Sequence, residues 1–238
     1  MKRLHFLVEG PTEREFIENV LAPHLYGFDK ICDARLITTS RDWSGGVFYK
    51  GGVTSYGKLR FEIQSQIAVD HNSDSYFTTM LDYYGLPKDF PGVAIPANGG
   101  GARQAVQAIE VLFEGDILSL FPALNFVGHF LPNILCHEFE SLIFAAPDQL
   151  LNYYPTRQVE VQNLQQQLIA CGGDPELVNN SRVTAPSKRI LSEIGEYDKV
   201  TAGALVAMDI GLDALRQKCS HFDAWISKLE KLSCEMTA

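Results

Sequence analysis

Short apolar runs alternate along the chain with segments whose apolar positions recur at helical spacing. The first run ends at Val8 and is too short for a helix, so it predicts a buried strand. Gly10 and Pro11 then interrupt the pattern. Apolar residues at helical spacing follow, which predicts a helix from Thr12 to about Leu21. The first unit is therefore a strand, a tight turn and a helix.

Two local signals set the expected ends of this helix. Thr12 followed by Glu15 matches a capping box, in which both side chains bond to free backbone N–H groups of the first turn. Pro23 lacks an N–H group and disfavours a continuing helix. We therefore expect the helix to begin at Thr12 and to end before Pro23.

The same alternation continues to about residue 150. Further strands are predicted at residues 33–39, 75–81 and 124–136, the last broken by Pro132, and further helices at residues 58–69 and 99–116. The alternation is typical of an α/β fold with a mainly parallel sheet flanked by helices. We expect a core at residues 1–150 and a helical C-terminal region at residues 151–238, packed on that core.

Acidic residues stand where three of the apolar runs end. They are Glu9 with Glu13, then Asp82, and then Glu138 and Glu140 after His137. The carboxyl ends of parallel strands meet at one edge of a sheet, so these side chains should converge. Crowded carboxylates repel one another and resist ionisation, and a divalent cation would relieve this. Oxygen ligands without a thiolate cluster favour Mg²⁺ or Mn²⁺.

The same acids have ordinary structural uses. Acids in a first helical turn, such as Glu13, complement the helix dipole. A carboxylate at the end of a buried strand, such as Glu9, needs compensation, but an arginine would provide it as well as a metal ion. Both alternatives remain open at the level of the sequence.

Composition narrows the class of protein. The 238 residues include 29 acidic and 20 basic side chains, a net charge of −9, which argues against broad electrostatic binding to nucleic acid but allows a local basic groove. No apolar run is long enough to span a membrane, and the first one is too short for a signal peptide, so we expect a cytoplasmic protein. The five scattered cysteines form no Cys-x-x-Cys pair, which disfavours a zinc knuckle or a disulfide framework.

Several sequence motifs resemble those of known families. "LVEGPTE" resembles the first motif of Toprim domains, the metal-dependent fold of topoisomerases, primases and the overcoming-lysogenisation-defect nucleases. More closely, "VEGPTE…MLDYYGLP.DFPG…PNILCHEFESLIF…APSKRI" resembles a bacterial Toprim-like family of unknown function, number 4276. This resemblance covers Leu7 to about Ile190, which is most of the chain.

The resemblance implies roles for the acids. Glu9 matches the Toprim glutamate, a metal ligand or general acid–base, and Glu13 matches the second glutamate. Asp82 matches the first Asp of the Toprim Asp-x-Asp pair, but Tyr84 stands at the second position. A ligand is therefore missing, and Glu138 or Glu140 is expected to supply it.

Two further residues are catalytic candidates. Lys188 is similar to a lysine that stabilises charge near the scissile phosphate in related nucleases, although a solvated lysine at a helix start would look the same. His137 could ligate the metal or accept a proton from an attacking water, or it could be a hydrogen-bonded structural residue.

Two functions are expected from these observations. The first is a Mg²⁺-dependent Toprim-like nuclease that hydrolyses phosphodiesters, of DNA rather than RNA, in phage defence or DNA repair with an ATPase partner protein. The second is a non-catalytic, metal-binding interaction subunit of an ATPase-containing defence complex. A phosphotransferase or phosphatase is disfavoured, because the sequence has no phosphate-binding Gly-Lys-Ser/Thr loop.

Overall fold

The computed structural model describes residues 1–37, 55–93, 101–122, 126–179 and 181–232. Most of the glycine-rich stretch that joins the second predicted strand to the next helix, and Cys234, lie outside these residues. The described cysteines, Cys32, Cys136, Cys171 and Cys219, are free. No helix that the described residues form has the length and apolar character needed to cross a membrane.

A parallel sheet forms the centre of the fold. Its strands are β1 (Lys2–Val8), β2 (Lys30–Leu36), β3 (Ser75–Asp82), β4 (Phe130–Leu131) and β5 (Ile134–Leu135). The order across the sheet is β2-β1-β3-β4, and β5 extends the pairing along β3. Every pairing is parallel, and Val8 lies opposite Met80 in the register of β1 and β3. The predicted α/β class with a parallel sheet is confirmed.

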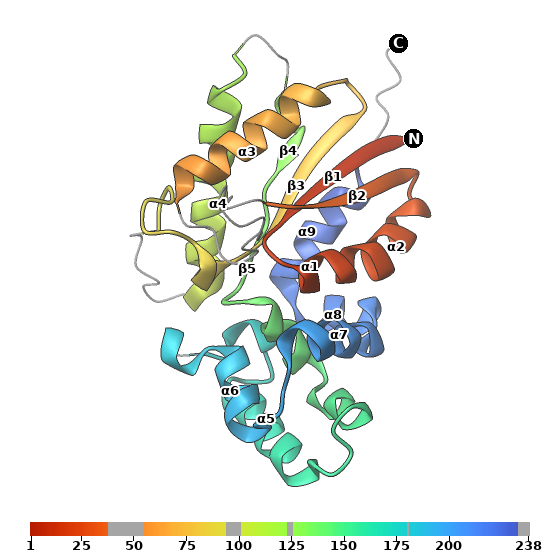
Figure 1. Ribbon diagram of the computed structural model, residues 1–238, viewed down its shortest axis with the longest axis vertical. Helices are drawn as coiled ribbons and strands as arrows, with labels where there is room; N and C mark the ends of the chain where they lie inside the picture. The colour runs from red at the N-terminus through yellow and green to blue at the C-terminus, as the bar shows by residue number, and fades with distance from the viewer. Residues whose placement is uncertain (38–54, 94–100, 123–125, 180, 233–238) are drawn as a thin grey trace, which may run out of the picture.

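Helices cover both faces of this sheet (Figure 1). One face carries α3 (Tyr56–Val69) and α4 (Gly101–Ser119), and the other carries α1 (Pro11–Phe16), α2 (Ala22–Tyr26) and α9 (Ser220–Glu230). The period of two along β1 produces this arrangement, because Phe6 and Val8 join one apolar cluster and Leu7 joins the other. All three side chains are buried, so the strand is apolar on both sides, as expected for a covered parallel sheet.

The first helix differs from its prediction at both ends. It begins at Pro11 after Gly10, with no side-chain cap, and Thr12 is buried, so the predicted capping box is wrong. Proline suits the first helical position because its φ is preset and its missing N–H would have had no partner there. The helix then continues past Pro23 to Tyr26.

A π-helical turn, η1 (Ile17–Leu21), makes this continuation possible. In it the N–H of Ala22 donates to the carbonyl of Ile17, five residues back. A proline in a regular helix clashes with the carbonyl of the preceding turn, and the wider turn before Pro23 accommodates its ring. The predicted end of the helix before Pro23 is therefore wrong.

The C-terminal part is helical, as predicted. Its regular helices are α5 (Gln158–Ala170), α6 (Pro186–Glu193), α7 (Ala204–Ile210) and α8 (Leu212–Lys218), besides α9. Short 3-10 and π segments join these elements to the sheet: η2 (Tyr83–Gly85), η3 (Phe139–Ala145), η4 (Pro147–Asn152), η5 (Pro175–Leu177), η6 (Arg182–Thr184) and the π-helix η7 (Lys199–Gly203). One apolar cluster runs from Leu4 in β1 to Leu229 in α9.

Helix α9 is attached to the sheet by a buried tryptophan. The Trp225 ring meets Phe6 edge to face with centroids 5.9 Å apart, and its Nε1–H donates to Thr78 Oγ1 over 2.8 Å. Both partners lie on central strands. The last described helix is thus a layer of the core.

A buried carboxylate holds the start of α9. Glu176 in η5 accepts hydrogen bonds of 3.0 Å from the backbone N–H groups of His221 and Phe222, which satisfies donors that a helix start leaves free. Arg103 of α4 pairs with the same carboxylate at 2.7 Å. Glu176 therefore links α9 to the helix layer on the opposite face of the sheet.

We expect Trp225→Phe to lower the free energy of unfolding by about 1–3 kcal/mol, because it removes the buried hydrogen bond to Thr78 and part of the ring packing. Chemical denaturation measures this. Phe61→Leu on the exposed side of α3 is the control, expected within about 0.5 kcal/mol of the wild type. Equal losses in both variants would contradict the role assigned to Trp225.

Candidate functional site

The strand order reverses direction between β1 and β3. From β1 the chain moves to β2 on one side, and it later returns to β3 on the other. In open α/β sheets, ligands bind beyond the carboxyl ends of strands at such a reversal. Glu9 directly follows β1 and Asp82 ends β3, so both acids stand at this point. The backbone N–H of Asp82 donates to Glu9 Oε1 over 3.2 Å.

Two more acids lie with them. Glu13, in the first turn of α1, is 3% exposed, and Glu140, in η3, is 0% exposed. Burial is the largest cause of the raised pKa values of Glu9, Glu13 and Glu140, and the charge of Asp82 adds to each, so these groups lie within electrostatic reach of Asp82. We call Glu9, Glu13, Asp82 and Glu140 the acid cluster. The predicted convergence of acids thus occurs, and Glu140 is the one that joins from the segment after His137.

Two glycines make room for the carboxylates. A Cβ at Gly10 would stand 2.7 Å from Glu13 Oε2, and a Cβ at Gly85 would stand 2.7 Å from Glu9 Oε2. Real Cβ atoms do not approach other atoms this closely, so a larger residue at either position would displace the carboxylate. The Gly-Pro turn after β1 therefore ends the strand and also leaves space for the Glu13 carboxylate.

Burial and mutual repulsion make these acids hard to ionise. Burial, followed by the charges of Asp82 and Glu13, raises the pKa of Glu9 well above its ordinary value. Burial raises the pKa of Glu13 to about 7, with Asp82 adding to the effect. Burial also raises the pKa of Glu140 to about 8. Several of these carboxyl groups therefore hold protons near neutral pH.

A lysine that the sequence analysis missed stands among them. Lys199 Nζ lies 3.0 Å from Glu140 Oε2 and 3.4 Å from Asp82 Oδ2. Burial disfavours its charge, but Asp82, Glu140 and Glu13 together raise the pKa of Lys199 above its ordinary value. The sequence allows a metal ion or an arginine as the compensating cation for Glu9, and the structure has a lysine in the cluster.

Glu140 remains incompletely satisfied despite this ion pair. Neither of its carboxylate oxygens accepts a hydrogen bond of good geometry from the described residues, and Oε1 has no ion pair either. The buried Tyr197 hydroxyl also has no hydrogen-bond partner among the described residues, and the charge of Glu140 is one cause of its raised pKa, after burial. Buried polar atoms are normally paired, so these two groups leave bonding capacity open beside the cluster.

Glu138 lies at the border of the cluster. Its Oε1 accepts a hydrogen bond from the backbone N–H of Ser187, in the first turn of α6. Its charge nevertheless contributes to the raised pKa of Glu140. The structure thus brings four of the five predicted metal ligands together and uses the fifth to hold a helix start.

His137 has a structural environment. Its Nε2–H donates to the carbonyl of Glu176 over 3.1 Å, and Nδ1, 3.2 Å from Asn179 Nδ2, accepts from that amide. Burial lowers the pKa of His137 to about 4, so the ring is neutral at neutral pH. Its φ of 71° is in the left-handed region, where the chain turns sharply from β5 toward η3, and the N–H of Tyr84 donates to its carbonyl over 2.9 Å. Its ring nitrogens are engaged away from the acids.

Lys188 lies exposed on α6 and forms no ion pair with the described residues. Its neighbour Arg189 donates to the carbonyl of Thr184 and to the side chain of Gln167. The described ion-pair partner of Glu140 is Lys199.

The acid cluster has the donor chemistry of a Mg²⁺ site but holds an ammonium group. Carboxylate oxygens are the ligands that Mg²⁺ and Mn²⁺ prefer. Within the described residues, however, no three His, Cys, Asp or Glu side chains are arranged so that they could hold a metal ion together. The side chains offer the oxygen donors that Mg²⁺ prefers, but in this structure Asp82 and Glu140 pair with the Lys199 ammonium group.

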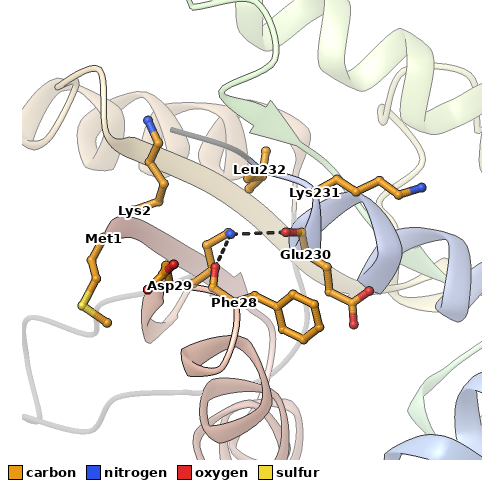
Figure 2. A pocket seen from close by; sticks show the side chains of 8 residues that line it. Met1, Lys2, Phe28, Asp29, Glu230, Lys231 and Leu232 are labelled. Carbon is orange, nitrogen blue, oxygen red and sulfur yellow. Dashed lines mark hydrogen bonds between the residues drawn. The ribbon is translucent and has the colours of Figure 1, made fainter. Parts of the chain in front are cut away.

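A cavity of about 470 Å³ lies elsewhere, at the amino ends of β1 and β2 (Figure 2). It is lined by Met1, Lys2, Phe28, Asp29, Lys30, Glu230, Lys231 and Leu232. Lys30 Nζ donates to the carbonyl of Glu230 over 3.3 Å across it. Because the acids stand at the carboxyl ends of the same sheet, this cavity is separate from the acid cluster.

Comparison with known proteins gave one match. The model of a family described as "Domain of unknown function (DUF4276)" matches residues 8–230, which includes every residue of the acid cluster and Lys199. The search of curated proteins found no match. The search of solved structures also found none.

Glu140 should make stability depend on pH. Folding raises its pKa from 4.5 to about 8, so the native state holds more protons than the unfolded chain between these values. The stability that this provides is fully present below pH 4.5 and is lost as the pH rises through about 8. We expect Glu140→Gln, which cannot ionise, to lose less stability than the wild type between pH 5 and pH 9, by about 1–3 kcal/mol.

Urea denaturation across this pH range measures the difference. Glu15→Gln is the matched control, because Glu15 lies on the same helix as Glu13 but outside the cluster. Parallel stability curves for wild type and Glu140→Gln would contradict the raised pKa of Glu140.

Proposed function

From the premise that the chain belongs to the DUF4276 family, we propose that it is a metal-dependent nuclease. Mg²⁺ or Mn²⁺ is the proposed cofactor, and phosphodiesters of nucleic acid are the proposed substrate. The observation that carries the proposal is the convergence of Glu9, Glu13, Asp82 and Glu140 where the strand order reverses. The resemblance of "LVEGPTE" to the first Toprim motif supports the same reading.

Charge favours a divalent cation at this place. Four carboxyl groups share the cluster, and one ammonium group lies among them. The raised pKa values of Glu9, Glu13 and Glu140 result first from burial and then from this excess of negative charge. A divalent cation would stabilise the ionised carboxylates, and the open bonding capacity of Glu140 provides a ligand for it.

In the proposed reaction the acid cluster would hold the metal ion, which would supply an activated water and neutralise charge on the phosphodiester. Gly10 and Gly85 leave room for the carboxylates of Glu13 and Glu9. His137 positions η3 through its turn and its ring contacts, so we give it a positioning role in place of the proton-accepting one. Lys188 lies exposed on α6, outside the acid cluster, and its role in stabilising charge near the scissile phosphate stays a prediction.

The proposed substrate is DNA, in phage defence or DNA repair. The net charge of −9 disfavours binding of nucleic acid by the whole surface. We therefore propose that an ATPase partner protein brings the substrate to the acid cluster.

A specific observation favours a second candidate function. Lys199 pairs with Asp82 and Glu140, so part of the charge of the cluster is compensated without a metal ion. The second candidate that we propose is a non-catalytic, metal-binding interaction subunit of an ATPase-containing defence complex. Tight Mn²⁺ binding without DNA cleavage, even in the presence of the ATPase, would favour this candidate.

Glu9→Gln should weaken Mn²⁺ binding by about 10- to 100-fold, because it removes one of the proposed carboxylate ligands. Calorimetric titration of metal-free protein measures the affinity, with Glu15→Gln as the control that keeps wild-type binding. Cleavage of double-stranded and single-stranded DNA and of RNA should fall in Glu9→Gln and Asp82→Asn alike. Undiminished cleavage in both variants would refute the proposal that the acid cluster is the active site of a nuclease.

Metal affinity should increase with pH. Glu13 and Glu140, with pKa values of about 7 and about 8, must lose protons when they bind the ion. Between pH 6 and pH 8 we expect a rise of about tenfold per pH unit for each proton displaced. Titrations in two buffers of different ionisation enthalpy count the protons released. An affinity that does not change over this range would place the metal away from the acid cluster.

A further inference from the structure

Lys199 is held by the acid cluster but is not enclosed by it. Its side chain is 37% exposed, whereas that of Glu140 is 0% exposed. Part of the lysine side chain therefore faces solvent, whereas the Glu140 side chain does not. A change of partner at this site moves the lysine more easily than Glu140.

The backbone around Lys199 is built differently from a regular helix. Lys199 is the first residue of the π-helix η7, which Asp198 caps by accepting a hydrogen bond of 3.0 Å from the N–H of Val200. The other end of η7 is packed closely, because a Cβ at Gly203 would lie 3.3 Å from the methyl group of Thr12. This packing fixes η7 against α1, so the long side chain of Lys199 is the part that can move.

Moving the Lys199 ammonium group out of the acid cluster would cost free energy. Asp82 and Glu140 would lose their one described ion-pair partner, and a buried carboxylate without a counter-charge must take up a proton or another cation. Glu140 already lacks hydrogen bonds from the described residues, so it has no second partner to turn to. A cation that takes the place of the ammonium group removes this cost.

We infer that Lys199 is a built-in competitor for the metal: a divalent cation enters the acid cluster by displacing the Lys199 ammonium group from Asp82 and Glu140. As they now lie, the described acids form no ready group of metal ligands, and in this proposal the ion takes the place between Asp82 and Glu140 that the ammonium group holds. The site is closed at low metal concentration and opens when the ion replaces the lysine. This inference rests on the proposed metal site and deepens it.

Lys199→Met tests the competition, since methionine has a similar shape and no charge. Calorimetric titration should show at least a tenfold tighter affinity for Mn²⁺ than in the wild type. Lys188→Met is the matched control, because it removes the same charge from an exposed position outside the cluster. Its affinity should stay within about twofold of the wild type. Equal affinities in Lys199→Met and Lys188→Met would overturn the inference and leave the metal site standing.

A measurement on the wild type does not depend on the folding of a variant. Acetylation of lysine amines, quantified by mass spectrometry, should increase at Lys199 when Mn²⁺ is added and stay constant at Lys188. Metal binding without increased reactivity of Lys199 would overturn the inference. No Mn²⁺ binding in either the wild type or Lys199→Met would instead refute the proposed metal site itself, and the inference with it.

Discussion

The structure around the candidate site depends on the cost of burying carboxylates where two neighbouring parallel strands end. The strands β1 and β3 are buried on both faces, and the chain puts Glu9 and Asp82 at their ends. Such groups require a compensating charge or a bound proton. The protein uses both, since Lys199 supplies a charge and the raised pKa values retain protons. The elements α1, η3 and η7 meet at these strand ends, and they bring Glu13, Glu140 and Lys199 respectively into the cluster.

Much of the acid cluster could be predicted from local signals. The apolar run before Glu9, the turn at Gly10 and the β-branched run before Asp82 identify two strand ends, and parallel pairing brings them together. The fold class followed from the same alternation. These features are short-range, so the sequence displays them directly.

Other features depend on contacts between distant segments. The sequence around Lys199 has no signal that separates it from a solvated turn, and its partner Asp82 lies 117 residues away. His137 stands beside Glu138, but its left-handed backbone turns its ring toward Glu176 and Asn179. The π turn before Pro23 likewise overrides the local rule that proline ends a helix, because the packing of α1 and α2 against the sheet favours a continuous element.

The position of α9 has a consequence for the order of folding. Trp225 reaches Thr78 across 147 positions of the chain, and Glu176 links the start of the same helix to α4. Contacts this distant form late, because the intervening loop must be closed first. During synthesis, the part of the sheet face that α9 covers therefore stays open until residues near 230 have left the ribosome. Until then, that apolar surface can associate with other chains, so rapid docking of α9 protects it.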